Sequence, residues 1–206
     1  MNFEFKEIAN IKCAVRYPDG FEEKKKYPVI LCLHGAGSRG DDPCTLKENY
    51  FFVATEKIEK FPFVSVMPLC PENQTWFDLL GELKALVDEI LGWSFIKGKI
   101  FLMGASMGGY GSWQLAMSVP EKIGAVAAAC GGGMYWNAKT LQNVPAWAFH
   151  GKEDTIVLCE ESIKMVNFIN RFGGRARITL YDGVGHESWQ KAYCDKELYK
   201  WFLRNI

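Results

Sequence analysis

Residues 99–112 constrain the fold of this chain more than any other stretch. An apolar run over 100–103 has the length of a buried parallel strand. The next five residues, Gly-Ala-Ser-Met-Gly at 104–108, match the pattern G-x-S-x-G, and a helix-like segment follows. A strand, a sharp turn and a helix in this order hold a serine hydroxyl above a sheet as a nucleophile. The pattern therefore nominates Ser106.

Two glycines give this pattern a physical reason. A turn this tight brings backbone against backbone, so a Cβ at Gly104 or Gly108 would collide with it. Five-residue patterns of common residues also arise by chance. The alternative interpretation is a glycine-rich strand-to-helix turn in which Ser106 only caps the helix. The rest of the chain has to decide between the two.

The alternation of apolar runs with amphipathic segments predicts an α/β fold. Two N-terminal segments, 3–8 and 11–17, alternate apolar with polar residues and predict an antiparallel strand pair joined near Ala9-Asn10. Beyond them, strands are expected at 29–33, 63–67, 100–103, 125–130, 145–150 and 177–181, and helices at 46–60, 79–91, 107–120, 162–172 and 189–203. This alternation predicts a mostly parallel central sheet with helices on both faces.

Length and composition predict a single globular domain over residues 1–206. Apolar residues make up 49% of the 206 residues, enough for a sizeable core. The 24 basic and 24 acidic residues balance, which argues against nucleic acid or an anionic membrane as a partner. We expect a monomer or small homo-oligomer. The N-terminus lacks the features of a signal peptide, and no apolar stretch reaches the ~18 residues that a membrane span needs.

The cysteine pattern favours a reducing cytoplasm. The seven cysteines are scattered singly, without C-x-x-C pairs, at positions 13, 32, 44, 70, 130, 159 and 194. An odd, dispersed set is atypical of a disulfide framework. The sequence has no metal-ligand spacing, phosphate-binding loop or dinucleotide motif, so we expect neither a metal nor a cofactor.

The histidines supply a candidate for the general base. In a parallel sheet, functional groups gather at the carboxyl ends of the strands. His34 and His150 each end a strand and precede glycine, where a histidine is better suited to shaping the loop by hydrogen bonding. His186 lies in a flexible loop after the last strand, from which its imidazole can reach a serine hydroxyl. We therefore expect His186 to be the base.

The third member of such a site is a carboxylate that accepts a hydrogen bond from the base. Asp154 lies just past the carboxyl end of the strand before His186. Glu153 is an alternative, Asp182 suits a turn, and Asp154 itself could be only a helix cap. The order Ser106, Asp154, His186 is the one expected for an α/β-hydrolase.

Acyl transfer also needs backbone donors for the developing oxyanion. Met107 N–H follows the candidate nucleophile at the start of a helix, and is one natural donor. The second is expected from the loop after the first central strand, where Ala36 lies between two glycines. These predictions place four elements at one edge of the sheet.

Four motifs together resemble the compact carboxylesterases of the α/β-hydrolase superfamily, grouped with dienelactone hydrolase, phospholipase/carboxylesterase and feruloyl esterases. They are His-Gly-Ala-Gly-Ser-Arg-Gly-Asp-Asp at 34–42, Gly-Ala-Ser-Met-Gly-Gly-Tyr-Gly-Ser-Trp at 104–113, His-Gly-Lys-Glu-Asp at 150–154 and Gly-His-Glu-Ser-Trp at 185–189. Dienelactone hydrolase itself is less similar, because its nucleophile is cysteine. The resemblance implies a Ser106–His186–Asp154 triad and ester hydrolysis through an acyl-enzyme.

The connection 131–144 is too short for the lid that lipases often carry, which favours small or partly soluble esters. Four aromatic residues lie in predicted loops at the catalytic edge, Trp76, Tyr135, Trp136 and Trp189, and the three tryptophans are the candidates for binding substrate. They would stack on a sugar or phenolic acyl group, or else serve as ordinary rim packing. We expect a serine esterase for short-acyl esters, such as acetyl or feruloyl esters of carbohydrates. A serine peptidase and a non-catalytic ligand-binding module are the alternatives.

Overall fold

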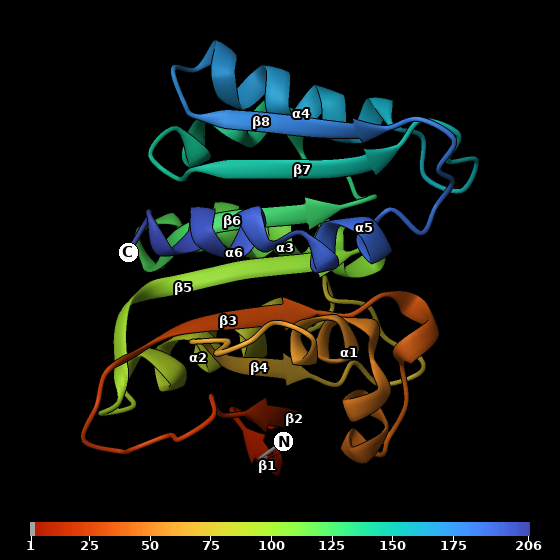
Figure 1. Ribbon diagram of the computed structural model, residues 1–206. Coiled ribbons are helices and arrows are strands. Elements are labelled where there is room, and N and C mark those ends of the chain that lie inside the picture. The colour runs from red at the N-terminus through yellow and green to blue at the C-terminus, as the bar shows by residue number, and fades with distance from the viewer. Residues whose placement is uncertain (1–2) are drawn as a thin grey trace.

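Eight strands form one sheet in the computed structural model, which describes residues 3–206 (Figure 1). Their spatial order is β1-β2-β4-β3-β5-β6-β7-β8, with β1 and β2 antiparallel and the strands from β4 to β8 parallel. The strands are β1 (Phe3–Ile8), β2 (Ile11–Arg16), β3 (Tyr27–Leu33), β4 (Val64–Pro68), β5 (Ile96–Ala105), β6 (Ile123–Ala129), β7 (Ala146–Gly151) and β8 (Ala176–Tyr181). The predicted α/β architecture with its antiparallel N-terminal pair is confirmed.

The first two strands are joined by a two-residue turn, as the alternation predicted. Ile8 pairs with Ile11, and the two residues between them, Ala9 and Asn10, both have positive φ angles of 50° and 63°. Two successive left-handed residues match the right-handed twist of a hairpin. The antiparallel pair thus extends the parallel sheet at one edge without a crossover helix.

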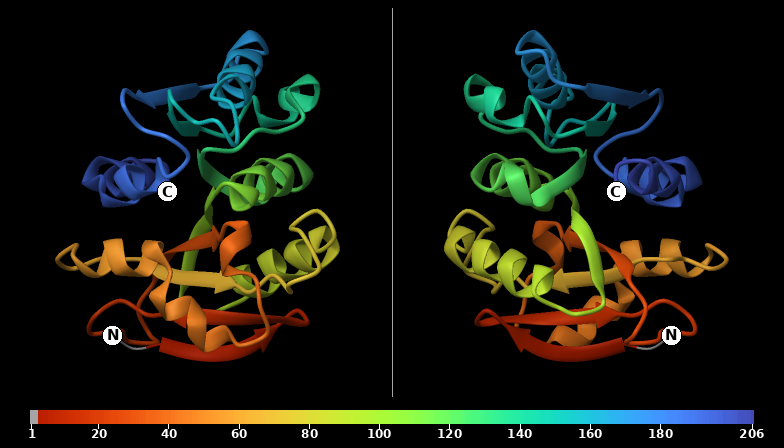
Figure 2. Two further views of the ribbon diagram at one scale, coloured as in Figure 1. Left: turned by 90° about the vertical axis from the view of Figure 1, so that its right-hand side faces the viewer. Right: turned by 90° about the vertical axis from the view of Figure 1, so that its left-hand side faces the viewer.

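Helices cover both faces of the sheet (Figure 2). One face carries α2 (Leu80–Leu91), α3 (Met107–Ser118) and α4 (Glu160–Arg171), and the other carries α1 (Tyr50–Glu56), α5 (Trp189–Cys194) and α6 (Lys196–Leu203). The central strand β3 is buried on both faces, as its unbroken apolar run predicted. None of the helices in residues 3–206 is long and apolar enough to cross a membrane.

Two of the predicted helices are interrupted by capping side chains. The segment 46–60 forms a 3₁₀ helix (Pro43–Glu48) and then the short α1, because the Asn49 side chain accepts a hydrogen bond from Phe51 N–H. The segment 189–203 is divided at Asp195, whose side chain accepts from Glu197 N–H at 2.9 Å. Asn and Asp side chains compete with the helical hydrogen bonds, so each starts a new helix.

The segment predicted to be too short for a lid, 131–144, contains one 3₁₀ helix (Tyr135–Leu141). This helix packs against α3 and α4 rather than standing apart from the domain. Its buried side chains Ala138 and Leu141 join the core on that face of the sheet. The carboxyl ends of the parallel strands all lie at the right-hand side of Figure 1, where the connecting loops gather.

Candidate active site

Ser106 occupies a strained turn between β5 and α3. Its backbone has φ 55° and ψ −120°, a conformation that non-glycine residues rarely adopt. Close backbone contacts hold the turn, since a Cβ at Gly104 would meet the carbonyl of Gly108, and one at Gly108 would meet the carbonyl of Leu33. The steric reason predicted for both glycines is therefore present. The turn lifts the Ser106 side chain to the edge of the sheet.

Hydrogen bonds connect Ser106, His186 and Asp154 in a continuous chain. His186 Nε2 lies 2.9 Å from Ser106 Oγ, and Nδ1 lies 2.8 Å from Asp154 Oδ2. A carboxylate can only accept, so Nδ1 carries the ring hydrogen and Nε2 is free to accept from the serine hydroxyl. The three residues follow β5, β7 and β8, and the structure brings them together although up to 80 positions separate them in sequence.

The Asp154 carboxylate is buried and fully hydrogen-bonded. Its Oδ1 accepts from the N–H groups of Ile156 and Val157, both at 2.9 Å. Burial raises the pKa of Asp154, but the hydrogen bond from His186 and those from the two N–H groups outweigh it, so the pKa lies below its ordinary value. The group is therefore an anion at neutral pH.

The two other carboxylates considered for this role serve the histidine loop instead. Glu153 accepts from Val184 N–H at 2.8 Å, and its own N–H donates to the Val184 carbonyl at 3.0 Å. Asp182 is exposed and pairs with Lys152 at 2.6 Å. These contacts fix the loop that carries the histidine, and neither carboxylate replaces Asp154.

His34 holds the loop after β3 in a defined orientation. Its Nε2 accepts from Cys70 N–H at 3.1 Å, so the ring hydrogen is on Nδ1, which lies 2.7 Å from the Gly35 carbonyl and donates to it. Burial lowers the pKa of His34 to about 4, which keeps the ring neutral. The Gly35 carbonyl belongs to the same peptide unit as Ala36 N–H. Because the two groups of a trans peptide point in opposite directions, Ala36 N–H faces away from the His34 ring.

Trp76, predicted to lie where it could contact substrate, is buried and does not line the cavity beside Ser106. Its ring is fully buried, and Nε1–H donates to the His34 carbonyl at 2.9 Å. The ring also meets the His34 imidazole edge to face at 4.9 Å between centroids, and Gly111 of α3 packs directly against it. Trp76 thus packs beneath the loop that carries Ala36 and holds it through the His34 carbonyl.

The other two predicted tryptophans differ from each other. Trp136 is 65% exposed on the 3₁₀ helix 135–141 and is absent from the described lining of the cavity beside Ser106, so the structure does not bear out its predicted substrate contact. Trp189 does line this cavity, and its ring lies 5.5 Å from the His186 ring, edge to face. Of the three tryptophans, Trp189 alone is where the prediction placed it.

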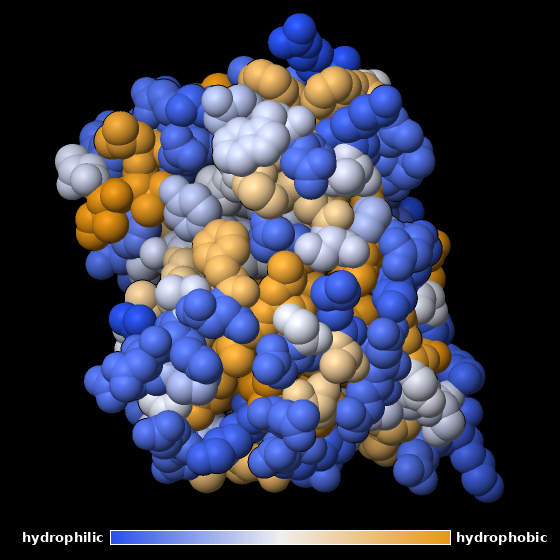
Figure 3. Space-filling view, turned by 180° about the vertical axis from the view of Figure 1, so that it is seen from behind, coloured by the Kyte–Doolittle hydropathy of each residue, from blue (hydrophilic) through white to orange (hydrophobic). Residues whose placement is uncertain are grey.

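The cavity beside Ser106 has a volume of about 480 Å³. Buried Cys32 and Tyr193 line it, and so does Ile156, which is 73% exposed. Figure 3 shows apolar surface at the left-hand edge of the molecule, where the carboxyl ends of the strands lie. Sequence reasoning missed the remaining side-chain walls of this cavity, Ser38, Glu48, Asn49 and Tyr50, because they come from the segment that was predicted as loop and continuous helix.

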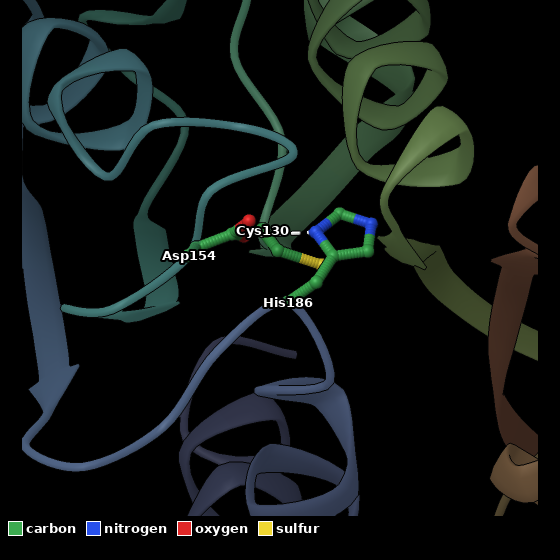
Figure 4. A group of neighbouring side chains, drawn as sticks. All are labelled: Cys130, Asp154 and His186. Carbon is green, nitrogen blue, oxygen red and sulfur yellow. Dashed lines mark hydrogen bonds and ion pairs between the residues drawn. The ribbon is translucent and has the colours of Figure 1, made fainter.

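Cys130, Asp154 and His186 are a group whose atoms could in principle hold a metal (Figure 4). One sulfur, oxygen or nitrogen atom from each lies within 4.8 Å of the others. Binding would require His186 Nδ1 to lose the hydrogen that it donates to Asp154, and burial raises the pKa of the Cys130 thiol to about 12. The arrangement favours the hydrogen-bonded chain over a metal centre.

Solved structures with the same fold include esterases and one domain of a peptidase. A thermostable esterase is 26% identical with a TM-score of 0.87, covering 98% of this chain and 62% of its own length, so this chain spans less than two thirds of that protein. Est1E from Butyrivibrio proteoclasticus, in a structure with ferulic acid bound, is 15% identical with a TM-score of 0.73 and covers 98% of this chain and 99% of its own. Dipeptidyl peptidase 4 from Porphyromonas gingivalis is 12% identical with a TM-score of 0.76, covering 100% of this chain and 35% of that chain. The last two, at such low identity, share the fold alone.

Sequence comparison gives the family. No curated protein matches the chain. The pattern of the phospholipase/carboxylesterase family matches residues 61–196, a range that contains Ser106, Asp154 and His186. This range covers well over half of the chain. The chain therefore belongs to the phospholipase/carboxylesterase family and has the α/β-hydrolase fold.

Proposed function

We propose that this protein is a serine esterase that hydrolyses short-acyl carboxylic esters through an acyl-enzyme. Ser106 is the nucleophile, His186 is the general base, and Asp154 is the carboxylate that orients His186. The observation that carries the proposal is the unbroken hydrogen-bonded path from Ser106 Oγ through His186 to Asp154, beside a cavity large enough for an acyl group. Family membership supports ester hydrolysis as the class of reaction.

The geometry supports a two-step reaction. Ser106 Oγ attacks the ester carbonyl while its proton passes to His186 Nε2, and Asp154 stabilises the imidazolium that forms. The tetrahedral intermediate expels the alcohol, which takes the proton from Nε2. A water molecule then repeats the sequence on the acyl-enzyme, releasing the carboxylic acid and restoring the serine hydroxyl.

Ala36 and Met107 are the proposed oxyanion donors. Within residues 3–206, neither backbone N–H has a protein acceptor. Gly35 brings the first donor close, since a Cβ at Gly35 would lie 3.6 Å from Ser106 Cβ. The second donor is the first residue of α3, where the helix dipole also favours negative charge. Both donors are fixed before substrate binds, which is the condition for strong electrostatic stabilisation.

The oxyanion proposal predicts a specific effect of Trp76→Phe. This change removes the N–H that holds the His34 carbonyl and replaces the buried indole by a smaller phenyl ring, a loss of volume that the control below shares. We expect kcat to fall by about tenfold because the donor loop relaxes, with KM changed less than about twofold. Steady-state kinetics on a p-nitrophenyl ester measures both constants.

Trp113→Phe is the matched control for this variant. Trp113 is also fully buried, but its indole N–H has no hydrogen-bond partner among the described residues. We expect its kcat to match the wild type. Equal losses in the two variants would mean that the hydrogen bond to His34 does not orient the oxyanion loop.

The cavity predicts the preferred acyl length. Each methylene that enters the apolar cavity gains ~0.8 kcal/mol, about fourfold in kcat/KM, whereas a methylene that stays in water gains nothing. With buried Cys32 and Tyr193 in its lining, and with the segment 131–144 packed against α3 and α4 and not lining it, we expect kcat/KM to rise from acetyl to butanoyl or hexanoyl esters and to fall by dodecanoyl. A panel of p-nitrophenyl esters measures this, with methyl ferulate as an aromatic acyl group.

The same panel tests the alternatives. A steady rise in kcat/KM up to the dodecanoyl ester would contradict the short-acyl proposal. A dipeptidyl p-nitroanilide hydrolysed faster than the best ester would favour the peptidase, and no turnover of any substrate would favour a binding module.

All seven cysteines are free thiols, which supports the proposed cytoplasmic location.

A further inference from the structure

A second histidine contacts the Asp154 carboxylate from the side opposite the reaction. His150 is the penultimate residue of β7 and is fully buried, and its Nε2 lies 3.1 Å from Asp154 Oδ2 and 2.9 Å from the Val157 carbonyl. Both partners are acceptors, so Nε2 must carry a hydrogen, which the two oxygens share. The same carboxylate oxygen therefore accepts from two imidazoles, His186 on the substrate side and His150 within the protein.

The other nitrogen of His150 is also held. Its Nδ1 lies 2.7 Å from the hydroxyl oxygen of Ser162, a buried residue in the first turn of α4. That hydroxyl lies 3.0 Å from the Gly131 carbonyl, in the loop after β6. In a neutral ring with its hydrogen on Nε2, Nδ1 is an acceptor, so the single Ser162 hydroxyl hydrogen is divided between Nδ1 and the Gly131 carbonyl. In that arrangement His186 is the one imidazole on Asp154 that gains a charge during the reaction.

We propose that His150 is a positioning residue, held by Ser162, that fixes the Asp154 carboxylate for its work on His186. This inference rests on the proposed role of Asp154. Two backbone N–H groups hold Oδ1 and His150 holds Oδ2, so the carboxylate cannot rotate about its Cβ–Cγ bond without breaking buried hydrogen bonds. The contact also withdraws part of the negative charge from Oδ2, which limits how strongly Asp154 attracts the proton of His186.

Two substitutions separate the hydrogen bond to Asp154 from the rest of the side chain. In His150→Gln, the amide nitrogen takes the place of Nε2 and can still donate to Asp154. In His150→Asn, the amide reaches only as far as Nδ1, so it can contact Ser162 but not Asp154. We expect kcat to fall by about 10- to 100-fold in His150→Asn and by less than about fivefold in His150→Gln, with KM nearly constant in both.

The dependence of kcat/KM on pH distinguishes a positioning role of His150 from a purely structural one, because a purely structural role would not shift it. Without the donor on Oδ2, Asp154 attracts the His186 proton more strongly, so the acidic limb of kcat/KM shifts to higher pH in His150→Asn and stays in place in His150→Gln. If the two variants lose activity equally with no shift of the limb, the inference is wrong. Full activity in His150→Asn would overturn it as well.

Ser162→Ala keeps the test decisive if His150→Asn does not fold. It removes the hydroxyl that contacts both Nδ1 and the Gly131 carbonyl and frees the His150 ring, so we expect the same shift of the acidic limb with a smaller loss of kcat. An unchanged profile in a folded Ser162→Ala protein would contradict the inference. Different results would contradict the proposed function: wild-type protein that does not hydrolyse esters, or activity that survives the loss of Ser106.

Discussion

Ser106→Ala is expected to lower kcat for p-nitrophenyl butyrate by about 10⁶-fold. The variant keeps the positive φ of the turn, the glycine packing around it and the oxyanion donors, but it has no oxygen to attack the ester carbonyl. The residual rate then reflects only binding and stabilisation of the oxyanion with water as the nucleophile. Stopped-time assays at high enzyme concentration are needed to measure a rate this low.

A serine at the far end of the helix that follows Ser106 is the control for this experiment. Ser118→Ala removes a hydroxyl that donates to the Gln114 carbonyl at the far end of α3. We expect it to keep the wild-type kcat. If Ser106→Ala hydrolysed the ester as fast as the wild type, neither the nucleophile nor the acyl-enzyme proposal would survive.

Asp154→Asn is expected to lower kcat by about 10⁴-fold while the fold is kept. The amide can donate to His186 Nδ1, which would place the ring hydrogen on Nε2 and block acceptance of the Ser106 proton. It also removes the charge that stabilises the imidazolium. Kinetics over a range of pH should find the loss at every pH, because no titration restores the missing carboxylate.

Stability should change with pH in a defined direction. The pKa of Asp154 is lowered on folding from its ordinary 3.8, so this group stabilises the wild type above the unfolded pKa. That stabilisation is lost as the pH falls through the folded pKa. Denaturant unfolding should therefore separate wild type from Asp154→Asn most at neutral pH and least in strong acid.

Glu153→Gln is the matched control for the charge. Glu153 accepts from Val184 N–H with a carboxylate oxygen, and the glutamine amide oxygen can accept the same bond. We expect activity within a few-fold of the wild type. A loss as large as that of Asp154→Asn would mean that the proposed acid has been assigned to the wrong carboxylate.

The backbone architecture was predictable because each strand and each catalytic loop has a local signature. Ser106, Asp154 and His186 could be nominated from the sequence because each follows an apolar run at the same edge of a parallel sheet. Trp76 could not be placed in this way. Its burial depends on His34 and Gly111, which are distant in sequence, and nothing in its own segment signals that contact.

The helix boundaries failed for a different reason. Asn49 and Asp195 lie within segments whose apolar spacing continues through them, so periodicity alone predicts one helix. A search for capping residues within those segments would have found both breaks. The cavity walls at Asn49 and Tyr50 depend on the first of these breaks, and for that reason the sequence did not indicate them.

The strained backbone at Ser106 determines when the free-energy cost of positioning its side chain arises. Holding a serine at φ 55° is unfavourable by about 1–3 kcal/mol, and the β-sheet and the packing of Gly104 and Gly108 oppose its relaxation. That cost is borne once, when the chain folds, and is the same whether or not an ester is bound. No part of this cost has to be met again in each turnover, so the proposed nucleophile of every folded molecule is in position before the substrate arrives.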